Sequence, residues 1–83
     1  MVYPNPAQSN STVNIEWKQN ESGQFNLQLF NMNGQIVFEK ELYIDAEAKL
    51  LGVDLPRLIA GNYLVKMTNS KTSKSYTEKL IVQ

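Results

Sequence analysis

The fold of this chain is decided by the stretch Phe25-Asn26-Leu27-Gln28-Leu29-Phe30-Asn31-Met32-Asn33-Gly34. Phe25, Leu27 and Leu29 alternate with Asn26 and Gln28, and a period of two is typical of a β-strand that buries one of its faces. Because a turn signal follows this alternation directly, the stretch predicts the first half of a β-hairpin.

The turn of this hairpin is predicted from the dipeptide Asn33-Gly34. A two-residue type I′ turn needs positive φ at both central positions, and asparagine and glycine adopt that conformation most readily. We therefore expect a strand that ends near Met32, a two-residue turn, and a second strand that begins at Gln35. Ile36 and Phe38 should share one face of the second strand because they are two positions apart.

The same alternation recurs in four further segments. The predicted inward rows are Val13, Ile15 and Trp17; Leu51, Val53 and Leu55; Tyr63, Val65 and Met67; and, in the last strand, either Tyr76, Glu78, Leu80 and Val82 or Thr77, Lys79 and Ile81. Residues 45–51 favour a helix by propensity but are too few to form one alone, so we interpret them as a loop. Short strands without a helical stripe predict an all-β fold, a small immunoglobulin-like antiparallel β-sandwich of about seven strands.

Length and composition limit the classes of function. The chain has 83 residues, which fits a single domain over residues 1–83 with a modest core. It contains no cysteine, and eight basic side chains balance eight acidic ones to a net charge of zero. We therefore expect no disulfide, no nucleic-acid partner and no binding to an anionic membrane. No apolar run approaches the roughly 20 residues that span a bilayer, so membrane insertion is not expected either.

The side chains that build the commonest catalytic and metal sites are missing. Without histidine or cysteine, nucleophilic triads and the usual zinc sites are excluded. The pairs Asp45 with Glu47 and Glu39 with Glu41 are interpreted as solvated surface, because like-charge pairs are common on protein surfaces and predict a site only weakly. We predict no catalytic, cofactor-binding or metal-binding residues, and a protein that is not an enzyme.

A tyrosine corner is predicted from Leu58, Gly61 and Tyr63. In immunoglobulin-like sandwiches, a tyrosine near the start of a late strand bonds through its hydroxyl to the backbone a few residues upstream, which fastens a crossover between the sheets. Gly61 would allow a tight backbone at this place, and Leu58 would fill the core beneath it. We interpret Gly61 and Tyr63 as structural residues.

A rival interpretation rests on the aromatic residues Trp17, Phe30, Phe38 and Tyr43. If several of these rings were exposed in one patch, the domain would be a carbohydrate-binding or adhesive immunoglobulin-like module of a cell-surface protein. Trp17 is in phase with Val13 and Ile15, which favours burial. The exposure of Trp17 and Phe30 distinguishes the two interpretations.

Four motifs occur in a fixed order along nearly the whole chain. They are Tyr3-Pro4-Asn5-Pro6, Asn33-Gly34-Gln35-Ile36-Val37, Leu58-Ile59-Ala60-Gly61-Asn62-Tyr63 and Glu78-Lys79-Leu80-Ile81-Val82-Gln83. In this order they resemble the C-terminal sorting domain, of type A, that is carried by proteins exported through the type IX (Por) secretion system. Taken alone, the first motif is only a stiff segment in which two prolines fix φ and Asn5 can cap a turn.

The resemblance implies a secretion signal that is recognised by other proteins. The sorting-signal residues would be Pro4, Asn5, Pro6, Gly34, Gly61, Tyr63, Lys79, Leu80, Ile81 and Val82. In the family, the cargo passes the periplasm, crosses the outer membrane through the type IX translocon and reaches the cell surface or the medium, and a sortase-like peptidase commonly removes the domain. The resemblance thus implies a monomer behind an upstream cargo domain, with translocon and peptidase as partners and no cofactor.

Overall fold

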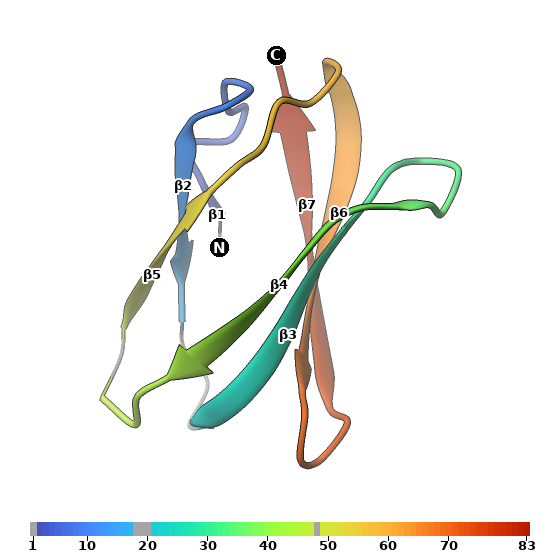
Figure 1. Cartoon of the computed structure of the whole chain (residues 1–83). Helices are drawn as coiled ribbons and strands as arrows, with labels where there is room; N and C mark the ends of the chain where they lie inside the picture. The colour runs from blue at the N-terminus through green and yellow to red at the C-terminus, as the bar shows by residue number, and fades with distance from the viewer. Residues whose placement is uncertain (1, 18–20, 48) are drawn as a thin grey trace.

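The computed structural model describes residues 2–17, 21–47 and 49–83, and their secondary structure is entirely β (Figure 1). The seven strands in this part of the chain are β1 (Val2–Tyr3), β2 (Thr12–Glu16), β3 (Gly23–Phe30), β4 (Ile36–Ile44), β5 (Leu50–Asp54), β6 (Gly61–Asn69) and β7 (Ser75–Val82). The all-β prediction is confirmed. None of the described residues forms a helix long and apolar enough to cross a membrane.

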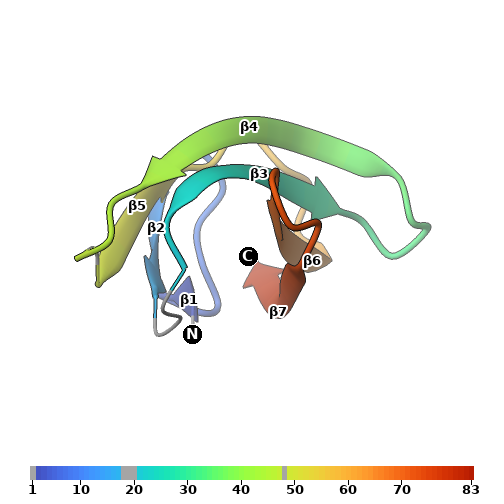
Figure 2. The same cartoon turned by 90° about the horizontal axis from the view of Figure 1, so that it is seen from below.

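The strands form two sheets that face each other across an apolar core. One sheet has the order β1-β2-β5 and the other the order β4-β3-β6-β7, and all pairings between these strands are antiparallel. Figure 2 shows the layers from below, with β3 and β4 curving over the space between the sheets. The chain changes sheet between β2 and β3, between β4 and β5, and between β5 and β6. This arrangement confirms the predicted immunoglobulin-like sandwich.

Most side chains of the predicted inward rows lie in the core, although Leu51 is only partly buried, and Val2, Ala7 and Ile44 join the core without having been predicted. The buried apolar side chains are Val2, Ala7, Val13, Ile15, Trp17, Phe25, Leu27, Leu29, Ile44, Val53, Leu55, Tyr63, Val65, Met67, Leu80 and Val82. The Trp17 ring meets Phe25 and Tyr76 edge to face, with centroids 5.1 and 5.6 Å away. Each fully buried side chain of this size stabilises the fold by about 1.5–3 kcal/mol relative to exposure. In the absence of cysteine, this burial is the main source of stability.

The register of β7 is settled by its burial pattern. Leu80 and Val82 point into the core, whereas Lys79 and Ile81 lie on the solvent face. Of the two registers that the sequence allowed, the one with Tyr76, Glu78, Leu80 and Val82 on one face is therefore adopted, with Tyr76 partly buried and Glu78 exposed.

The hairpin between β3 and β4 differs from the predicted type I′ turn. The Gly34 N–H donates to the carbonyl oxygen of Asn31 (3.0 Å), and the Asn31 N–H donates to the carbonyl oxygen of Gln35 (3.0 Å). Gly34 is the only residue of this turn with positive φ, at 80°. The prediction of a two-residue turn centred on Asn33-Gly34 is therefore wrong, because the loop has three residues and closes with glycine in the left-handed conformation.

The side chain of Asn31 explains why the longer turn forms. Its Oδ1 accepts from the N–H groups of Asn33 and Gln35, and its Nδ2 donates to the Gln35 side chain. Asparagine at the first position of a turn commonly bonds the backbone two residues on. This local preference shortens both strands, so that β3 ends at Phe30 and β4 begins at Ile36.

A β-bulge next to this turn changes which side chains of β4 face the core. Ile36 is opposite Phe30, but Phe38 is opposite Leu29, so one extra residue is inserted in β4. The prediction that Ile36 and Phe38 share a face is wrong for this reason. Phe38 packs against the core, whereas Ile36 lies on the outer face and is 50% exposed.

Replacing Gly34 by alanine tests the conformation of the turn. A side chain at φ 80° is strained although no atom lies within 4 Å of the added Cβ, so we expect Gly34→Ala to destabilise the domain by about 1 kcal/mol. Gly52→Ala is the control, because Gly52 has an ordinary φ and its Cβ would make only ordinary contacts at 3.8 Å. Urea denaturation measures both changes, and equal midpoints would contradict the strained turn.

Candidate functional site

The side chain of Asn5 joins the beginning of the chain to its last strand. The Asn5 Nδ2 donates to the carbonyl oxygen of Lys79 (2.9 Å), and the Asn5 Oδ1 accepts from the N–H of Ile81 (2.9 Å). The side-chain amide thus takes the place of a neighbouring peptide group along β7. Asn5 therefore bonds a strand 74 residues further along the chain instead of capping a local turn. The peptide bonds that precede Pro4 and Pro6 are both cis.

Ala7 extends this pairing in the backbone. The Ala7 N–H donates to the carbonyl oxygen of Ile81 (2.7 Å), and the Ala7 carbonyl oxygen accepts from the N–H of Gln83 (2.8 Å). Ala7 and Val82 form a parallel bridge and are both buried. β7 lies at the edge of its sheet, where its backbone groups would otherwise be unpaired. Residues 5–7 cover the C-terminal part of this edge.

The tyrosine corner adjoins the same part of β7. The Tyr63 hydroxyl donates to the carbonyl oxygen of Ile59, and the tyrosine is only 6% exposed, so the predicted corner is confirmed. Leu58 is partly buried against the core, and its N–H donates to the Ser9 hydroxyl (2.7 Å). Gly61 begins β6 with φ 157°, at the margin of the region that other residues rarely adopt. The corner thus fixes the crossover from β5 to β6.

The predicted signal residues gather at one end of the sandwich. Gly61 pairs with Val82 and Tyr63 with Leu80 across β6 and β7, while residues 4–6 lie along the other side of β7. In Figure 1 this end is at the top, where the C-terminus and the start of β6 lie together. Gly34 is separate in the chain, but its hairpin leaves the four-stranded sheet toward the same end. The structure therefore brings the first, third and fourth motifs together, whereas the hairpin that contains Gly34 is separated from β7 by β6.

Only some of these side chains are accessible. Leu80, Val82 and Tyr63 are buried, so their role in the folded domain is to hold the strands in place. Lys79 and Ile81 are exposed on the outer face of the sheet. Alternation along β7 therefore separates two side chains that stabilise the fold from two that a partner can contact.

The motif residues are held in place by pairing of backbone groups, and what they present to a partner is a surface of defined shape. Among the described residues, no three acidic, histidine or cysteine side chains come together in a way that could hold a metal ion. Glu39 accepts a hydrogen bond from Gln28 (2.9 Å) and Glu41 from Gln24 (3.5 Å) on the solvent face of β3 and β4. These exposed carboxylates fit the interpretation of Glu39 and Glu41 as solvated surface.

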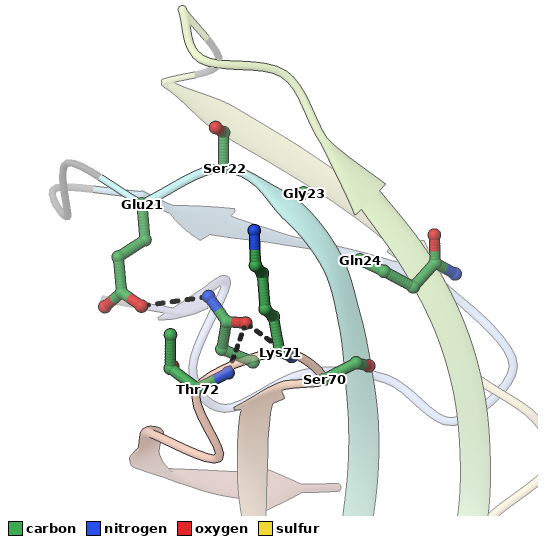
Figure 3. A pocket seen from close by; sticks show the side chains of 8 residues that line it. Glu21, Ser22, Gly23, Gln24, Ser70, Lys71 and Thr72 are labelled. Atoms are coloured by element: carbon green, nitrogen blue, oxygen red, sulfur yellow. Dashed lines mark hydrogen bonds between the residues drawn. The ribbon is translucent and has the colours of Figure 1, made fainter.

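A cleft of about 490 Å³, lined largely by polar residues, lies at the opposite end of the molecule (Figure 3). It lies between residues 21–24 and the turn that joins β6 to β7. The buried Asn69 donates to the Glu21 carboxylate (3.0 Å), and its Oδ1 accepts from the N–H groups of Lys71 and Thr72. These bonds hold the turn against the link from β2 to β3. Because these polar groups bond one another, we interpret the cleft as a structural junction between the β6–β7 turn and the link from β2 to β3.

The four aromatic rings of the rival interpretation do not form a common patch. Trp17 is 5% exposed and belongs to the core, and Phe38 also packs against the core. Phe30 is half-buried on the outer face opposite Ile36, whereas Tyr43 is 69% exposed and pairs with Gln24. Phe30 and Gln24 are six positions apart, about 20 Å along β3. The aromatic platform that a carbohydrate-binding module would need is not formed by these rings.

The geometry defines a small immunoglobulin-like domain in which an N-terminal segment covers the edge of the terminal strand. A family model described as the secretion system C-terminal sorting domain matches residues 1–83, so the chain belongs to this family. The resemblance to type IX (Por) sorting domains is thereby confirmed, and the chain is a signal domain for secretion across the outer membrane to the cell surface.

Comparison with solved structures supports the fold. The chain is similar to part of PorZ, an essential bacterial surface component of the type IX secretion system of Porphyromonas gingivalis, with a TM-score of 0.71 and 19% sequence identity. The similarity covers 100% of this chain and 11% of the PorZ chain, and at this identity it shows a common sandwich fold. No curated protein matches the chain.

Removing the Tyr63 hydroxyl tests the corner. Tyr63→Phe should lower the free energy of unfolding by about 1 kcal/mol, because one hydrogen bond to a backbone carbonyl is lost while the ring remains in the core. Tyr43→Phe is the matched control, since Tyr43 is 69% exposed. Thermal melting followed by circular dichroism measures both variants, and an unchanged midpoint for Tyr63→Phe would contradict a stabilising corner.

Substituting Asn5 tests the junction between the chain ends. Asn5→Ala should cost about 1 kcal/mol, because both hydrogen bonds are lost but water can replace them at this exposed position. Asn5→Asp should cost at least as much, since its second carboxylate oxygen would face the Lys79 carbonyl oxygen. Asn62→Ala, at an exposed position of β6, is the control. If Asn5→Asp unfolded at the same urea concentration as the unsubstituted domain, the amide pairing would not matter for stability.

Proposed function

We propose that this domain acts without catalysis, as an address on a cargo protein that the type IX translocon recognises in the folded state. The observation that carries the proposal is that the first and third family motifs both lie along the terminal strand, where residues 5–7 hold β7 in a defined position. A signal that had to be unfolded for recognition would not need its end fixed in this way. Membership of the sorting-domain family supports the same role.

The signal residues divide into two groups under this proposal. Pro4, Asn5, Pro6, Gly34, Gly61, Tyr63, Leu80 and Val82 shape and hold the terminal region, whereas Lys79 and Ile81 present side chains to the machinery. The division follows from burial: Leu80 is 0% and Val82 2% exposed, whereas Ile81 is 36% exposed. Substitutions in the first group would therefore reduce secretion through loss of folding, and those in the second group through loss of contact.

The route and partners follow from the family. The cargo domain would precede residues 1–83 on the same chain, and the protein would pass through the periplasm before it crosses the outer membrane. A sortase-like peptidase would then remove the domain, and the secreted cargo would stay on the cell surface or enter the medium. The domain would act as a monomer.

Secretion of a reporter tests the proposal directly. The domain is joined behind a periplasmic signal peptide and a fluorescent protein, and the fluorescence of cells, periplasm and medium is measured in a type IX-competent host. We expect surface or extracellular fluorescence in this host and periplasmic fluorescence in a host without the translocon. The same reporter without residues 1–83 is the control. An equal distribution in both hosts would overturn the proposed function.

A further inference from the structure

An open groove of about 570 Å³ lies on the outer face of the four-stranded sheet, beneath the hairpin that joins β3 to β4. We call it the hairpin groove. Phe30 and Leu64 form part of its floor, Met32 and Gly34 line it from the hairpin, and Lys66 lines it from β6. In Figures 1 and 2 the hairpin projects beyond the rest of the sheet.

An exposed apolar row crosses the sheet at the groove. The registers place Ile36 opposite Phe30, Phe30 opposite Leu64, and Leu64 opposite Lys79, on four neighbouring strands. Ile36 is 50% exposed and Leu64 39% exposed, and Met32 above them is 59% exposed. The next row along the strands is polar, with Glu39, Gln28, Lys66 and Thr77. The apolar side chains are therefore concentrated at the end of the face that also bears the sorting motifs.

Positive charge borders the apolar row on one side. Lys66 and Lys79 flank Leu64 on β6 and β7. Within the described part of the chain, neither lysine forms an ion pair. The carboxylates of this face, Glu39 and Glu41, lie on β4, where they accept hydrogen bonds from glutamines. An apolar group that enters the groove would thus have two cations beside it and no acidic side chain next to Leu64.

We propose that the hairpin groove binds a segment of a protein of the secretion machinery, in which an apolar side chain packs against Phe30 and Leu64 and a nearby carboxylate pairs with Lys66 or Lys79. This inference rests on the proposed function, because it assigns the surface that the translocon contacts. The two lysines favour a partner that carries an acidic group, because opposite charges attract. The small size of the apolar row favours a partner that inserts a single apolar side chain.

Two other occupants fit the groove less well. An anionic membrane would meet Glu39 and Glu41 on the same face, and the chain as a whole has a net charge of zero. A second copy of the domain would contact the groove symmetrically and would bring the lysines of both copies together. A narrow acidic and apolar segment avoids both conflicts, because it can lie over β6 and β7 without contacting β4.

The location also links the groove to the sorting motifs. Gly34 lines it, and Lys79 ends the apolar row. The left-handed conformation of Gly34 at φ 80° closes the turn from which Met32 projects, and the bulge at Ile36 turns that side chain outward. The hairpin glycine and the terminal lysine, which are distant in sequence, thus contribute to one surface.

Paired substitutions in the secretion reporter test the proposal. Leu64→Ser removes the apolar contact, and Leu50→Ser is its control, because Leu50 is 53% exposed on the opposite sheet. Lys66→Glu reverses the charge, and Lys74→Glu in the turn between β6 and β7 is its control. Loss of one central contact typically weakens binding by about tenfold or more. We expect both groove variants to lower the secreted fraction several-fold, with both controls close to the unsubstituted reporter.

Folding and secretion must be measured together. Urea denaturation of each purified variant identifies any loss of stability, and Lys66→Glu, a change at the surface, remains informative if Leu64→Ser unfolds. Groove variants that stay folded and are secreted like their controls would overturn the proposal. In that case, translocon-dependent secretion of the unsubstituted reporter would still support the proposed function. If secretion of the unsubstituted reporter did not depend on the translocon, the proposed function itself would be overturned.

Crosslinking identifies the occupant. A photo-reactive amino acid replaces Met32, which is 59% exposed above the groove, and the reporter is irradiated in the type IX-competent host. We expect an adduct with a protein of the translocon that is lost when Lys66→Glu is added. An adduct with lipid, an adduct between two copies of the domain, or no adduct with a translocon protein would each overturn the assignment.

Discussion

The apolar face shared by the two sheets is the constraint on which the other features of the domain depend. With 83 residues, no cysteine and no cluster of metal-ligating side chains among the described residues, the domain has to obtain its stability from the inward rows of its strands. These rows meet only if the chain crosses correctly between the sheets. The corner at Tyr63 fixes one crossing, and the bonds of Asn69 fix the turn and link at the other end.

The terminal strand contributes to the core and, under the proposed function, to recognition, and strand alternation keeps the two roles apart. Leu80 and Val82 complete the core, while Lys79 and Ile81 lie on the outer face. Residues 5–7 cover the free edge of this strand, which would otherwise be open to pairing with another chain. The last strand of the domain is thus held in place by residues from the beginning of the same domain.

The side chains on the outer face of the four-stranded sheet change in chemical character along the strands. Packing of the core does not require this change. Tyr43, Glu41 and Glu39 make one part aromatic and acidic, while the part near the C-terminus is apolar with two lysines. Exposed apolar residues are common when single, but a row across neighbouring strands is characteristic of an interaction surface. The bulge beside Leu29 creates this row, because it turns Ile36 outward and leaves Phe38 on the core side.

The sequence by itself determined where most of the strands lie, which face of most strands is buried, and the corner at Tyr63. These features follow from alternation and from local hydrogen-bonding preferences, which act between residues close in the chain. The order of the four motifs also identified the family. The tertiary structure alone decided the register of β7, because both faces of that strand carry apolar residues and only the completed core selects between them. It also decided the pairing of Asn5 with β7 and the groove beneath the hairpin, since both depend on contacts between strands whose distance in space no local pattern encodes.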